Sequence, residues 1–497
     1  MKYIPTIGLE VHAELKTRTK MFCDSANDPE ETRPNVNVCP VCMAHPGTLP
    51  VINREAVRHI VRIGTAIRGR IADFTEFDRK SYFYPDIPKG FQISQYEHPL
   101  VTGGELVGVA ITRVHLEEDT ARSSHAGGKS LVDFNRAGIP LMELVTEPVL
   151  HDAETAGRFA RELQLLLRTL GAGEANLEKG EMRIEANVSV SAKEGEFGLN
   201  QSEGLIGRTG QRPVLGTKVE VKNINSFRSV ERAIAFEVKR QSALLEKGGK
   251  VVQETRGWDE AKQETFHQRF KEGSADYRYF PEPDLPKLFL SEIPEFSPEA
   301  LRASLPELPW ERRARYEALG IRKEYADVLV QPENAFLMAL IEGVAKRASN
   351  NDKTLIGLAA NYIVSDVAGL MQDSSVESKF SYTSADDLYQ AFFNLMRMVE
   401  EEKVSSRGAK DVLAAMYRSG GDPETIAKGK GLLQVHDASA LQEAVSGVLK
   451  EEAKAVAEYR AGKEAALQYL IGKSMKATKG AGNPGILKEL IVKELGK

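Results

Sequence analysis

Strict alternation of apolar and polar residues near the N-terminus is the feature that most constrains the fold. Between residues 7 and 15 every odd position is apolar, whereas Glu10, His12 and Glu14 stand at even positions. Successive side chains of a β-strand point to opposite faces, so these polar groups share one face at intervals of roughly 6.6 Å. On its own, the segment fits an antiparallel strand whose polar face meets water.

Three later segments, 106–119, 182–190 and 217–223, alternate in the same way and also carry charged faces. Their polar sides hold Arg113, His115, Glu117 and Asp119; Arg183, Glu185 and Asn187; and Lys218, Glu220 and Lys222. If the four strands share one sheet, its open face is a field of carboxylates interleaved with arginine and lysine.

Such a face is suited to Mg²⁺, which proteins bind through a few carboxylates, water and substrate phosphates. The neighbouring basic side chains would neutralise phosphate oxygens during phosphoryl transfer. The chain contains no G-x-x-x-x-G-K-[ST] sequence, so an ordinary P-loop is excluded. The alternative is a salt-bridged, solvated sheet without a metal.

The size and composition indicate a globular protein of several domains. At 497 residues the chain exceeds the size of one hydrophobic core, and its 28% charged and 42% hydrophobic residues are ordinary for a globular protein. We see no signal-peptide pattern and no apolar run of ~18 residues, and three cysteines fit a reducing compartment. We therefore expect a cytoplasmic protein that does not enter a membrane. With a net charge of −5, a polyanion would have to be held by a local basic patch.

The order of the segments predicts an α+β fold: an antiparallel-sheet domain, then an all-helical domain and a small helical tail domain. Up to about residue 283, short strands surround two helices, 153–170 and 227–247. Later sequence is helical almost throughout, including 335–347, 355–372 and 385–401.

Two changes in composition suggest the domain boundaries. The proline-rich stretch 280–286 ends the strand-rich part, and Ala- and Lys-rich helices begin near residue 405. We therefore predict the domains 1–293, 294–405 and 406–497.

The loop 80–95 combines binding residues with turn residues. Lys80 and Lys89 are suited to phosphates, and the aromatic residues Tyr82, Phe83 and Tyr84 are suited to flanking a base or adenine. The alternative is a structural loop whose aromatic rings pack into the core.

Cys39 and Cys42, with Cys23 upstream, have the spacing of a structural zinc site. A tetrahedral site needs a fourth ligand, but Ser25 stands where a thiol is expected, which leaves His45 as a candidate. We therefore favour reduced, metal-free cysteines over bound Zn²⁺.

Several long motifs together resemble one known family. They are GLEVHAEL, CPVCMAHPGTLPVIN, FDRKSYFYPDIPKGFQISQY, RVHLEED, DFNRAGIPLMELVTEP, EMRIEANVSV, GTKVEVKNINSFRSVERAI and DYRYFPEPDLP. In this order they resemble the B subunits of bacterial aspartyl/glutamyl-tRNA amidotransferases over about the first 290 residues. A looser resemblance continues into the helical region and the Lys-rich tail.

The resemblance implies a ligase of protein biosynthesis with a catalytic cradle domain, a helical domain and a tail domain. The family works as a heterotrimer with an amidase subunit, which releases ammonia, and a small third subunit. The B subunit uses ATP and Mg²⁺ to phosphorylate the side-chain carboxyl of Glu or Asp misacylated on tRNA(Gln) or tRNA(Asn). Ammonia then displaces phosphate.

The resemblance also implies roles for residues of this chain. The expected catalytic residues are Glu10, His12, Lys80, Lys89 and Arg183, and the expected magnesium ligands are Glu10, His12, Glu117, Glu118, Glu185 and Asn187. The expected nucleotide contacts are Lys80, Tyr82, Lys89, Arg183 and Lys218. Glu185 stands where the family usually has Asp, and Ser25 replaces a family cysteine.

The Lys-rich end of the chain is expected to contact the tRNA backbone. Its lysines are Lys473, Lys476, Lys479, Lys488, Lys493 and Lys497. Two other functions stay open: a non-catalytic tRNA-binding scaffold, and an ATP-dependent amide synthetase acting on a free amino acid. The sequence does not decide which misacylated tRNA is the substrate.

Overall fold

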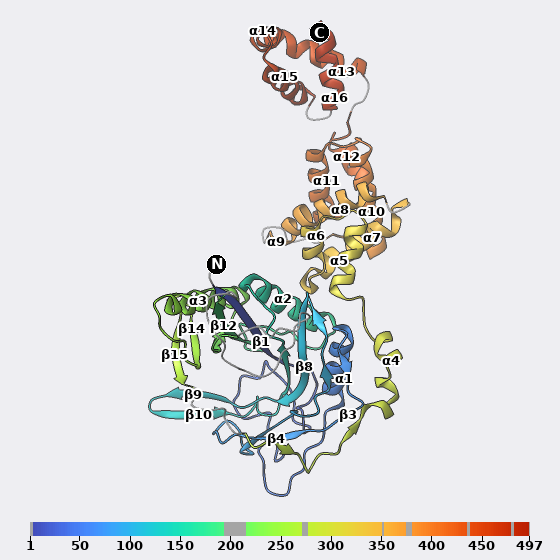
Figure 1. Ribbon diagram of the computed structural model, residues 1–497. Helices are drawn as coiled ribbons and strands as arrows, with labels where there is room; N and C mark the ends of the chain where they lie inside the picture. The colour runs from blue at the N-terminus through green and yellow to red at the C-terminus, as the bar shows by residue number, and fades with distance from the viewer. Residues whose placement is uncertain are drawn as a thin grey trace. The chain divides into compact units, whose positions relative to one another are not determined.

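The computed structural model describes residues 3–192, 215–270, 277–349, 352–373, 380–434, 438–478 and 482–496 (Figure 1). The chain divides into two compact units, 1–308 and 309–497. The first unit combines a large sheet with helices and the second is helical, which confirms the predicted α+β class. The predicted boundary between a helical domain and a tail domain stays a prediction.

A ten-stranded sheet organises the first unit. Its strand order is β15 (Glu264–Phe270), β14 (Glu254–Asp259), β13 (Val219–Ile224), β12 (Met182–Ala192), β1 (Tyr3–Glu14), β11 (Pro140–Thr146), β8 (Val109–Glu118), β6 (Val101–Thr102) and β2 (Arg70–Ile71), with β7 (Glu105–Leu106) paired to β8. Neighbouring strands are antiparallel except β13 and β14, which are parallel.

Small sheets and hairpins accompany it. They are β4 (Asp78–Ser81) with β5 (Phe91–Ser94) and β16 (Phe280–Pro281), β3 (Phe74–Thr75) with β17 (Leu288–Phe289), and β9 (Arg122–Ala126) with β10 (Lys129–Asp133). β5 lies against the free edge of β8, because Gln95 accepts a hydrogen bond from the Leu116 amide and Gln92 donates one to the Glu118 carbonyl. This contact places the loop 80–95 beside β8, which is separated from β1 by β11 alone.

The four strands expected from alternation are β1, β8, β12 and β13, and they do share one sheet. The predicted strand 106–119 is broken at Val107 and Gly108, which take positive φ angles of 48° and 81° in a turn. β11 was not predicted and lies between β1 and β8. All but one of its residues are buried, so it lacks the alternation that marks a strand with one exposed face.

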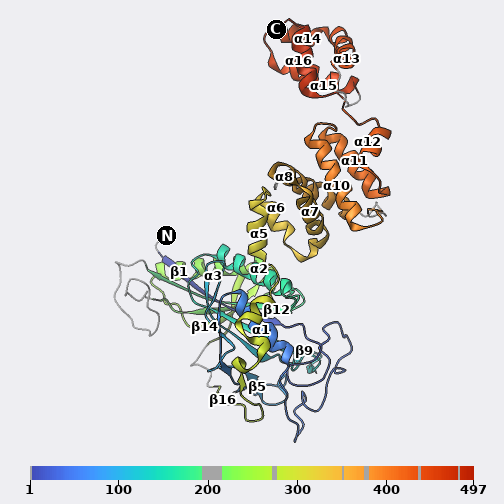
Figure 2. The same cartoon turned by 90° about the vertical axis from the view of Figure 1, so that its right-hand side faces the viewer.

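Helices α2 (Ala153–Thr169) and α3 (Phe227–Glu246) confirm the two predicted helices and lie along one side of the sheet (Figures 1 and 2). α2 begins at Asp152, whose side chain accepts a hydrogen bond from the Thr155 amide, and its Phe159 and Leu163 are fully buried. α3 packs against α2 and β12. The apolar side of the sheet is therefore covered, and its polar side is left for chemistry.

The expectation of only two helices among the strands was wrong, because α1 (Arg54–Ala66) is a third. Asn53 caps it by accepting hydrogen bonds from the amides of Glu55 and Ala56. Val57, Ile60 and Val61 are buried at helical spacing, a pattern that was present in the sequence. A short α4 (Pro298–Ala303) follows the two 3₁₀ turns η1 (Leu290–Glu292) and η2 (Pro294–Phe296).

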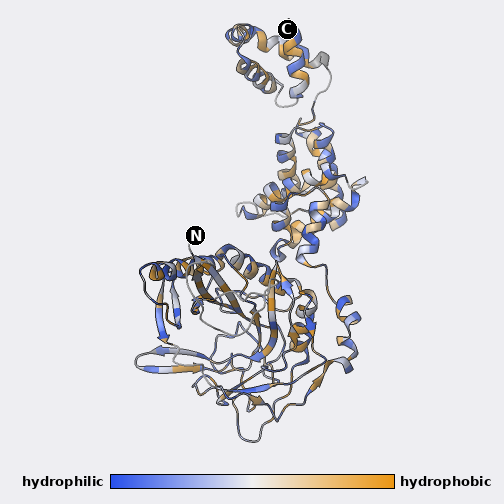
Figure 3. Ribbon diagram, viewed as in Figure 1, coloured by the Kyte–Doolittle hydropathy of each residue, from blue (hydrophilic) through white to orange (hydrophobic). Residues whose placement is uncertain are grey.

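The second unit is built from amphipathic helices, whose hydrophobic and hydrophilic bands are visible in Figure 3. They are α5 (Pro309–Ala318), α6 (Lys323–Leu329), α7 (Ala335–Arg347), α8 (Lys353–Tyr362), α9 (Ala368–Gln372), α10 (Ala385–Glu400), α11 (Ser406–Ser419), α12 (Pro423–Gly429), α13 (Ala438–Glu451), α14 (Ala453–Arg460), α15 (Glu464–Ala477) and α16 (Pro484–Glu494). The short 3₁₀ helix η3 (Pro332–Asn334) precedes α7, and a π-turn, η5 (Ile363–Val367), joins α8 to α9. The three helices predicted here are confirmed. α13, α15 and α16 enclose their own apolar cluster, which includes Leu441, Leu470 and Leu487.

One helical stretch of the described chain, 353–372, is long and apolar enough to cross a membrane, and the bent pair 323–329 and 332–347 would add a second if it formed one span. Leu355, Ile356 and Ala359 of this stretch are buried within the second unit. Core helices pass the same test of length and composition, so the expected absence of a membrane span stays a prediction.

The cap of α1 also holds the preceding loop, which leads to a stability prediction. The Asn53 amide group donates to the carbonyls of Thr19 and Lys20. The side chain of Asp152, the cap of α2, accepts hydrogen bonds from Thr155 of its own helix, the one partner found for it in the described part of the chain. Asn53→Ala should lower the free energy of unfolding by about 2 kcal/mol, and Asp152→Ala by about 1 kcal/mol. Scanning calorimetry of the full chain measures both through the transition of the first unit. Equal shifts in Tm would show that the loop contacts contribute nothing.

Candidate functional site

The centre of the polar face is a row of three side chains on adjacent strands. His12 of β1 and His115 of β8 both stand directly opposite Glu143 of β11. The Nε2 atoms of His12 and His115 lie 3.5 and 3.3 Å from the same carboxylate oxygen of Glu143. The strand register therefore places one buried carboxylate between two imidazoles.

Two further carboxylates complete what we call the carboxylate–histidine cluster: Glu10, His12, His115, Glu117 and Glu143. His12 Nε2 lies 3.6 Å from Glu117 Oε1 and 3.9 Å from Glu10 Oε1. The potential ligand atoms of Glu10, His12 and Glu143 lie within 4.8 Å of one another, and so do those of His115, Glu117 and Glu143. Glu143 belongs to both groups.

The donor set of the cluster fits a hard divalent cation such as Mg²⁺. Carboxylate oxygens from three strands converge, and a hard cation prefers such oxygen ligands. Burial and the negative charges of Glu143 and Glu185 raise the pKa of Glu10. Burial of His12 opposes protonation, but a hydrogen bond to Glu143 and the charges of Glu117 and Glu10 outweigh it and raise the pKa to about 9. The negative charges of the cluster thus favour a cation in the site, and a bound metal ion would supply that positive charge.

Two members of the cluster were missed as ligands by the sequence analysis. Glu143 lies on the strand that was not predicted, and His115 was placed on the polar face without a role. The motif that carries Glu143, PLMELVT, contains one charged residue in an otherwise uncharged strand. A single carboxylate in a buried strand is costly unless it is paired, which is the signal that could have identified it.

Lys80 of β4 is the predicted phosphate contact that the structure brings to the cluster. Burial disfavours its charge, but Glu117, the Tyr279 hydroxyl and Glu143 outweigh this and raise the pKa of Lys80 above its usual range. Its Nζ atom also lies 5.0 Å from the centroid of the Tyr277 ring. A permanently protonated ammonium beside a metal site is suited to the oxygens of a transferring phosphoryl group.

Lys89 and Glu118 form a separate pair outside the cluster. Lys89 Nζ lies 2.6 Å from Glu118 Oε2, and Glu118 Oε1 accepts a hydrogen bond from the Ile93 amide. Glu118 neighbours Glu117 on β8, so the strand directs the two carboxylates to opposite faces. The structure therefore does not join Glu118 to the other expected magnesium ligands.

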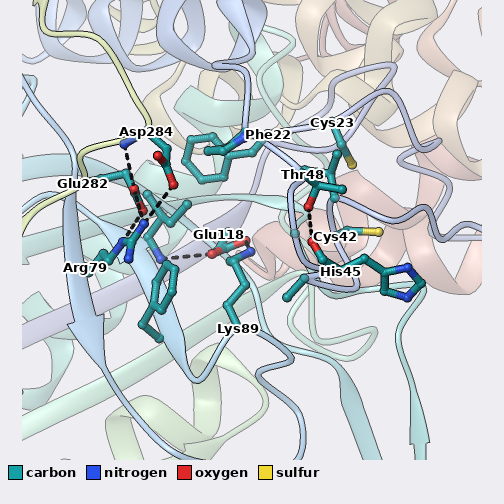
Figure 4. A pocket seen from close by; sticks show the side chains of 16 residues that line it. Phe22, Cys23, Cys42, His45, Thr48, Arg79, Lys89, Glu118, Glu282 and Asp284 are labelled. Atoms are coloured by element: carbon teal, nitrogen blue, oxygen red, sulfur yellow. Dashed lines mark hydrogen bonds and ion pairs between the residues drawn. The ribbon is translucent and has the colours of Figure 1, made fainter.

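The Lys89–Glu118 pair lines a pocket of about 200 Å³ next to the cysteine loop. Figure 4 shows Glu118 at its centre, Arg79 with Glu282 and Asp284 on one side, and the cysteine loop on the other. Its charged groups are already paired with one another, because Arg79 binds both acidic partners. A charged ligand would have to separate one of these pairs.

Glu185 lies opposite Glu10 in the strand register, as the sequence analysis requires for a shared site. Its carboxylate is held by Lys222, whose Nζ lies 2.8 Å from Oε2. Asn187 lies opposite Gly8, and its buried Oδ1 has no hydrogen-bond partner among the described residues. Lys218 is exposed just before β13. Glu185 therefore lies beside the cluster, whereas Lys218 is not among the residues that the strand register brings to it.

Arg183 takes part in a second charged group beside the cluster. Its Nη2 atom donates to both oxygens of Asp119 at 3.0 Å, and Arg136 Nε donates to the same carboxylate at 2.7 Å. Burial would raise the pKa of Asp119, but these two guanidinium groups outweigh it and lower the pKa. Burial and the charge of Asp119 raise the pKa of Glu14 to about 7. Arg183 is 40% exposed and so is accessible to a substrate.

The three cysteines lie together, as their spacing predicted. The sulfur atoms of Cys23, Cys39 and Cys42 are within 4.8 Å of one another, and the Ser25 hydroxyl lies 3.8 Å from Cys42 Sγ. The buried Nζ atom of Lys20 also lies 3.8 Å from Cys42 Sγ. Burial lowers the pKa of Lys20, and while this lysine is protonated it repels a cation bound to the thiols.

Comparisons with known proteins identify the family. Residues 5–293 match the family described as GatB/GatE catalytic domain, and residues 341–495 match the family described as GatB domain.

Curated proteins resemble the chain over nearly its whole length. The B subunit of the aspartyl/glutamyl-tRNA(Asn/Gln) amidotransferase of Thermus thermophilus is 42% identical, with 99% of both chains covered. That of Thermomicrobium roseum is 43% identical over 100% of this chain and 99% of the relative. The B subunit of the chloroplastic/mitochondrial glutamyl-tRNA(Gln) amidotransferase of Physcomitrium patens is 39% identical, over 99% of this chain and 86% of the relative. The chain therefore belongs to the family of B subunits of tRNA-dependent amidotransferases, which are multi-subunit enzymes of protein biosynthesis.

Proposed function

We propose that this chain is the ATP- and Mg²⁺-dependent part of a carbon–nitrogen ligase that acts on misacylated tRNA. The γ-phosphoryl group of ATP is transferred to the side-chain carboxylate of Glu or Asp carried by tRNA(Gln) or tRNA(Asn), leaving ADP. Ammonia then attacks the carbonyl carbon of the acyl phosphate, and phosphate leaves. The carboxylate–histidine cluster with Lys80 beside it is the observation that carries this proposal.

The proposed reaction needs no nucleophile from this chain. Its side chains neutralise charge and position the reactants. A carboxylate is a poor electrophile, and phosphorylation gives it a good leaving group. Glu10, His12 and Glu143 would hold Mg²⁺, which neutralises phosphate charge when bound. Lys80 neutralises the oxygens of the transferred group, and Arg183 lies exposed at the edge, where it is suited to orienting the substrate.

Partner subunits complete the proposed reaction. The relatives are named as B subunits of amidotransferases, which implies that other subunits exist. We propose that this chain joins an amidase subunit, which supplies ammonia from glutamine or asparagine, and a small third subunit in a cytoplasmic heterotrimer.

The exposure of three tail lysines supports a contact with the tRNA backbone. Lys476, Lys488 and Lys493 are exposed, whereas Lys473 is paired with Glu452 at 2.6 Å. Lys479 and Lys497 lie outside the described residues. The exposed lysines are therefore the ones proposed to position tRNA.

The first prediction from the proposed function separates an enzyme from a tRNA-binding scaffold. Glu143→Gln keeps the size of the side chain but removes the charge that both halves of the cluster share, so tRNA-dependent ATP hydrolysis should fall at least about 100-fold. tRNA affinity should stay within about twofold, since Glu143 is not one of the tail lysines proposed to contact the tRNA backbone. Glu147→Gln, just after β11 and hydrogen-bonded to Thr112, is the matched control. Unchanged hydrolysis by Glu143→Gln would favour the scaffold.

The second prediction separates this function from that of an amide synthetase acting on a free amino acid. ATP hydrolysis by the assembled complex should rise with Glu-tRNA(Gln) or Asp-tRNA(Asn), and free glutamate or aspartate should not stimulate it. Measuring ADP release with each of the four substrates tests this directly. The two tRNA reactions also determine which amino acid the enzyme amidates. Stimulation by a free amino acid alone would contradict the proposal.

The third prediction concerns the three cysteines, which we propose remain reduced and metal-free. Elemental analysis of the purified chain should find well under one Zn²⁺ per molecule. Ser25→Cys supplies a fourth thiol next to Cys42, and this variant should retain about one Zn²⁺. One tightly held zinc in the unchanged protein would refute the metal-free state.

A further inference from the structure

A row of tyrosine rings leads away from the carboxylate–histidine cluster; we call Tyr277, Tyr82 and Tyr84 the aromatic row. It begins at Tyr277, whose ring centroid lies 5.0 Å from Lys80 Nζ. The Tyr82 ring meets Tyr277 edge-on at 6.2 Å, and the Tyr84 ring stacks parallel on Tyr82 at 5.3 Å with an interplanar angle of 6°. The row thus connects the phosphoryl-transfer site to the surface.

The outer end of the row is open. Tyr84 is 60% exposed and the adjoining Phe83 is 84% exposed. Aromatic rings usually bury their faces, so a stacked ring with a free side is an unfilled contact surface. The proposed reaction assigns no role to this surface.

Turn hydrogen bonds and two prolines restrict the loop that carries the outer rings. The Tyr82 amide donates to the Gly90 carbonyl, and the Ile87 amide donates to the Tyr84 carbonyl. Pro85 and Pro88 restrict the backbone between them. A ligand that binds Tyr84 therefore loses little free energy to ordering of the loop.

We propose that the aromatic row binds the unpaired 3′-terminal base of the misacylated tRNA, an inference that rests on the proposed function. Proteins bind single-stranded nucleic acid by stacking bases on open aromatic side chains. The adenine of a nucleotide cofactor usually occupies an enclosed cleft instead. The exposure of Tyr84 therefore favours the tRNA end over ATP.

The position of the row matches the connectivity of that substrate. The terminal base and the amino acid are joined through a single ribose, so a base on the row places the amino acid toward Lys80. The inner ring of the row, Tyr277, lies 5.0 Å from Lys80 Nζ, so the row begins beside the lysine proposed to meet the transferred phosphoryl group. The base end and the carboxyl end of one substrate thus have adjoining sites.

The charge of Arg269 acts on the aromatic row. Burial, the neighbouring tyrosines and Asp86 raise the pKa of Tyr82, and the charge of Arg269 opposes this rise. Arg269 belongs to β15 and is exposed. Its guanidinium group is suited to the phosphate that precedes the terminal nucleotide.

Tyr84→Leu in the assembled amidotransferase tests the proposal, because leucine stays apolar but offers no ring for stacking. The KM for misacylated tRNA should rise about tenfold, and the KM for ATP should change less than twofold. Tyr84→Phe keeps the ring and should bind tRNA much more tightly than Tyr84→Leu. The matched control is Phe289→Leu, an exposed aromatic residue of the same unit that is 48% exposed and packs on Phe74.

A spectroscopic measurement separates stacking from a structural effect. Misacylated tRNA with 2-aminopurine as its terminal base should lose fluorescence on binding to the unchanged complex, and Tyr84→Leu should restore most of it. A rise in the KM for ATP alone, or a loss of complex assembly on size-exclusion chromatography, would overturn the inference. So would unaltered kinetics and quenching in the variant. Failure of the unchanged complex to hydrolyse ATP with tRNA would instead contradict the proposed function.

Discussion

The register between β1, β11 and β8 is the constraint on which the rest of the site depends. It places His12, Glu143 and His115 side by side, with Glu117 and Glu10 within 3.9 Å of His12. Several carboxylates held this close in a partly buried site repel one another unless a cation joins them. Because side chains alternate, a slip of one residue would turn the acidic groups into the apolar core. The covering helices α2 and α3 exclude that alternative by burying the other face.

Alternation alone was enough to predict four central strands and the polar face of β1. It failed where burial is two-sided: β11 is buried on both faces, so its pattern carries no period and Glu143 was missed. The same rule explains the placement of Glu118, since neighbours on a strand point apart and Glu117 alone reaches the cluster. Motif resemblance treated the two glutamates as equivalent, and strand geometry separates them.

Residues brought in by tertiary contacts could be predicted only as candidates. Lys80 and Lys89 belong to one loop and looked alike in the sequence, yet only Lys80 stands beside Glu117 and Glu143. Lys89 is engaged with Glu118. The difference arises from the way β5 packs against the edge of β8 while β4 pairs with β5, which local pattern does not encode. Helix α1 was missed for another reason. Its apolar residues have helical spacing in the sequence, but the strand-rich surroundings favoured an interpretation without a helix there.

The packing of β5 on β8, with β4 paired to β5, joins two kinds of recognition in one loop. Lys80 faces the cluster, and the chain then turns outward through Tyr82 to Tyr84, so phosphate chemistry and an open ring stack are four residues apart. A substrate with a carboxyl group at one end and a nucleobase at the other would contact both. Charge attracts phosphate groups but does not distinguish misacylated tRNA from a free amino acid, whereas a stacking site requires a base. Because β4 and this loop are continuous, seating the base would also position the carboxyl group, which links recognition of the substrate to the start of the reaction.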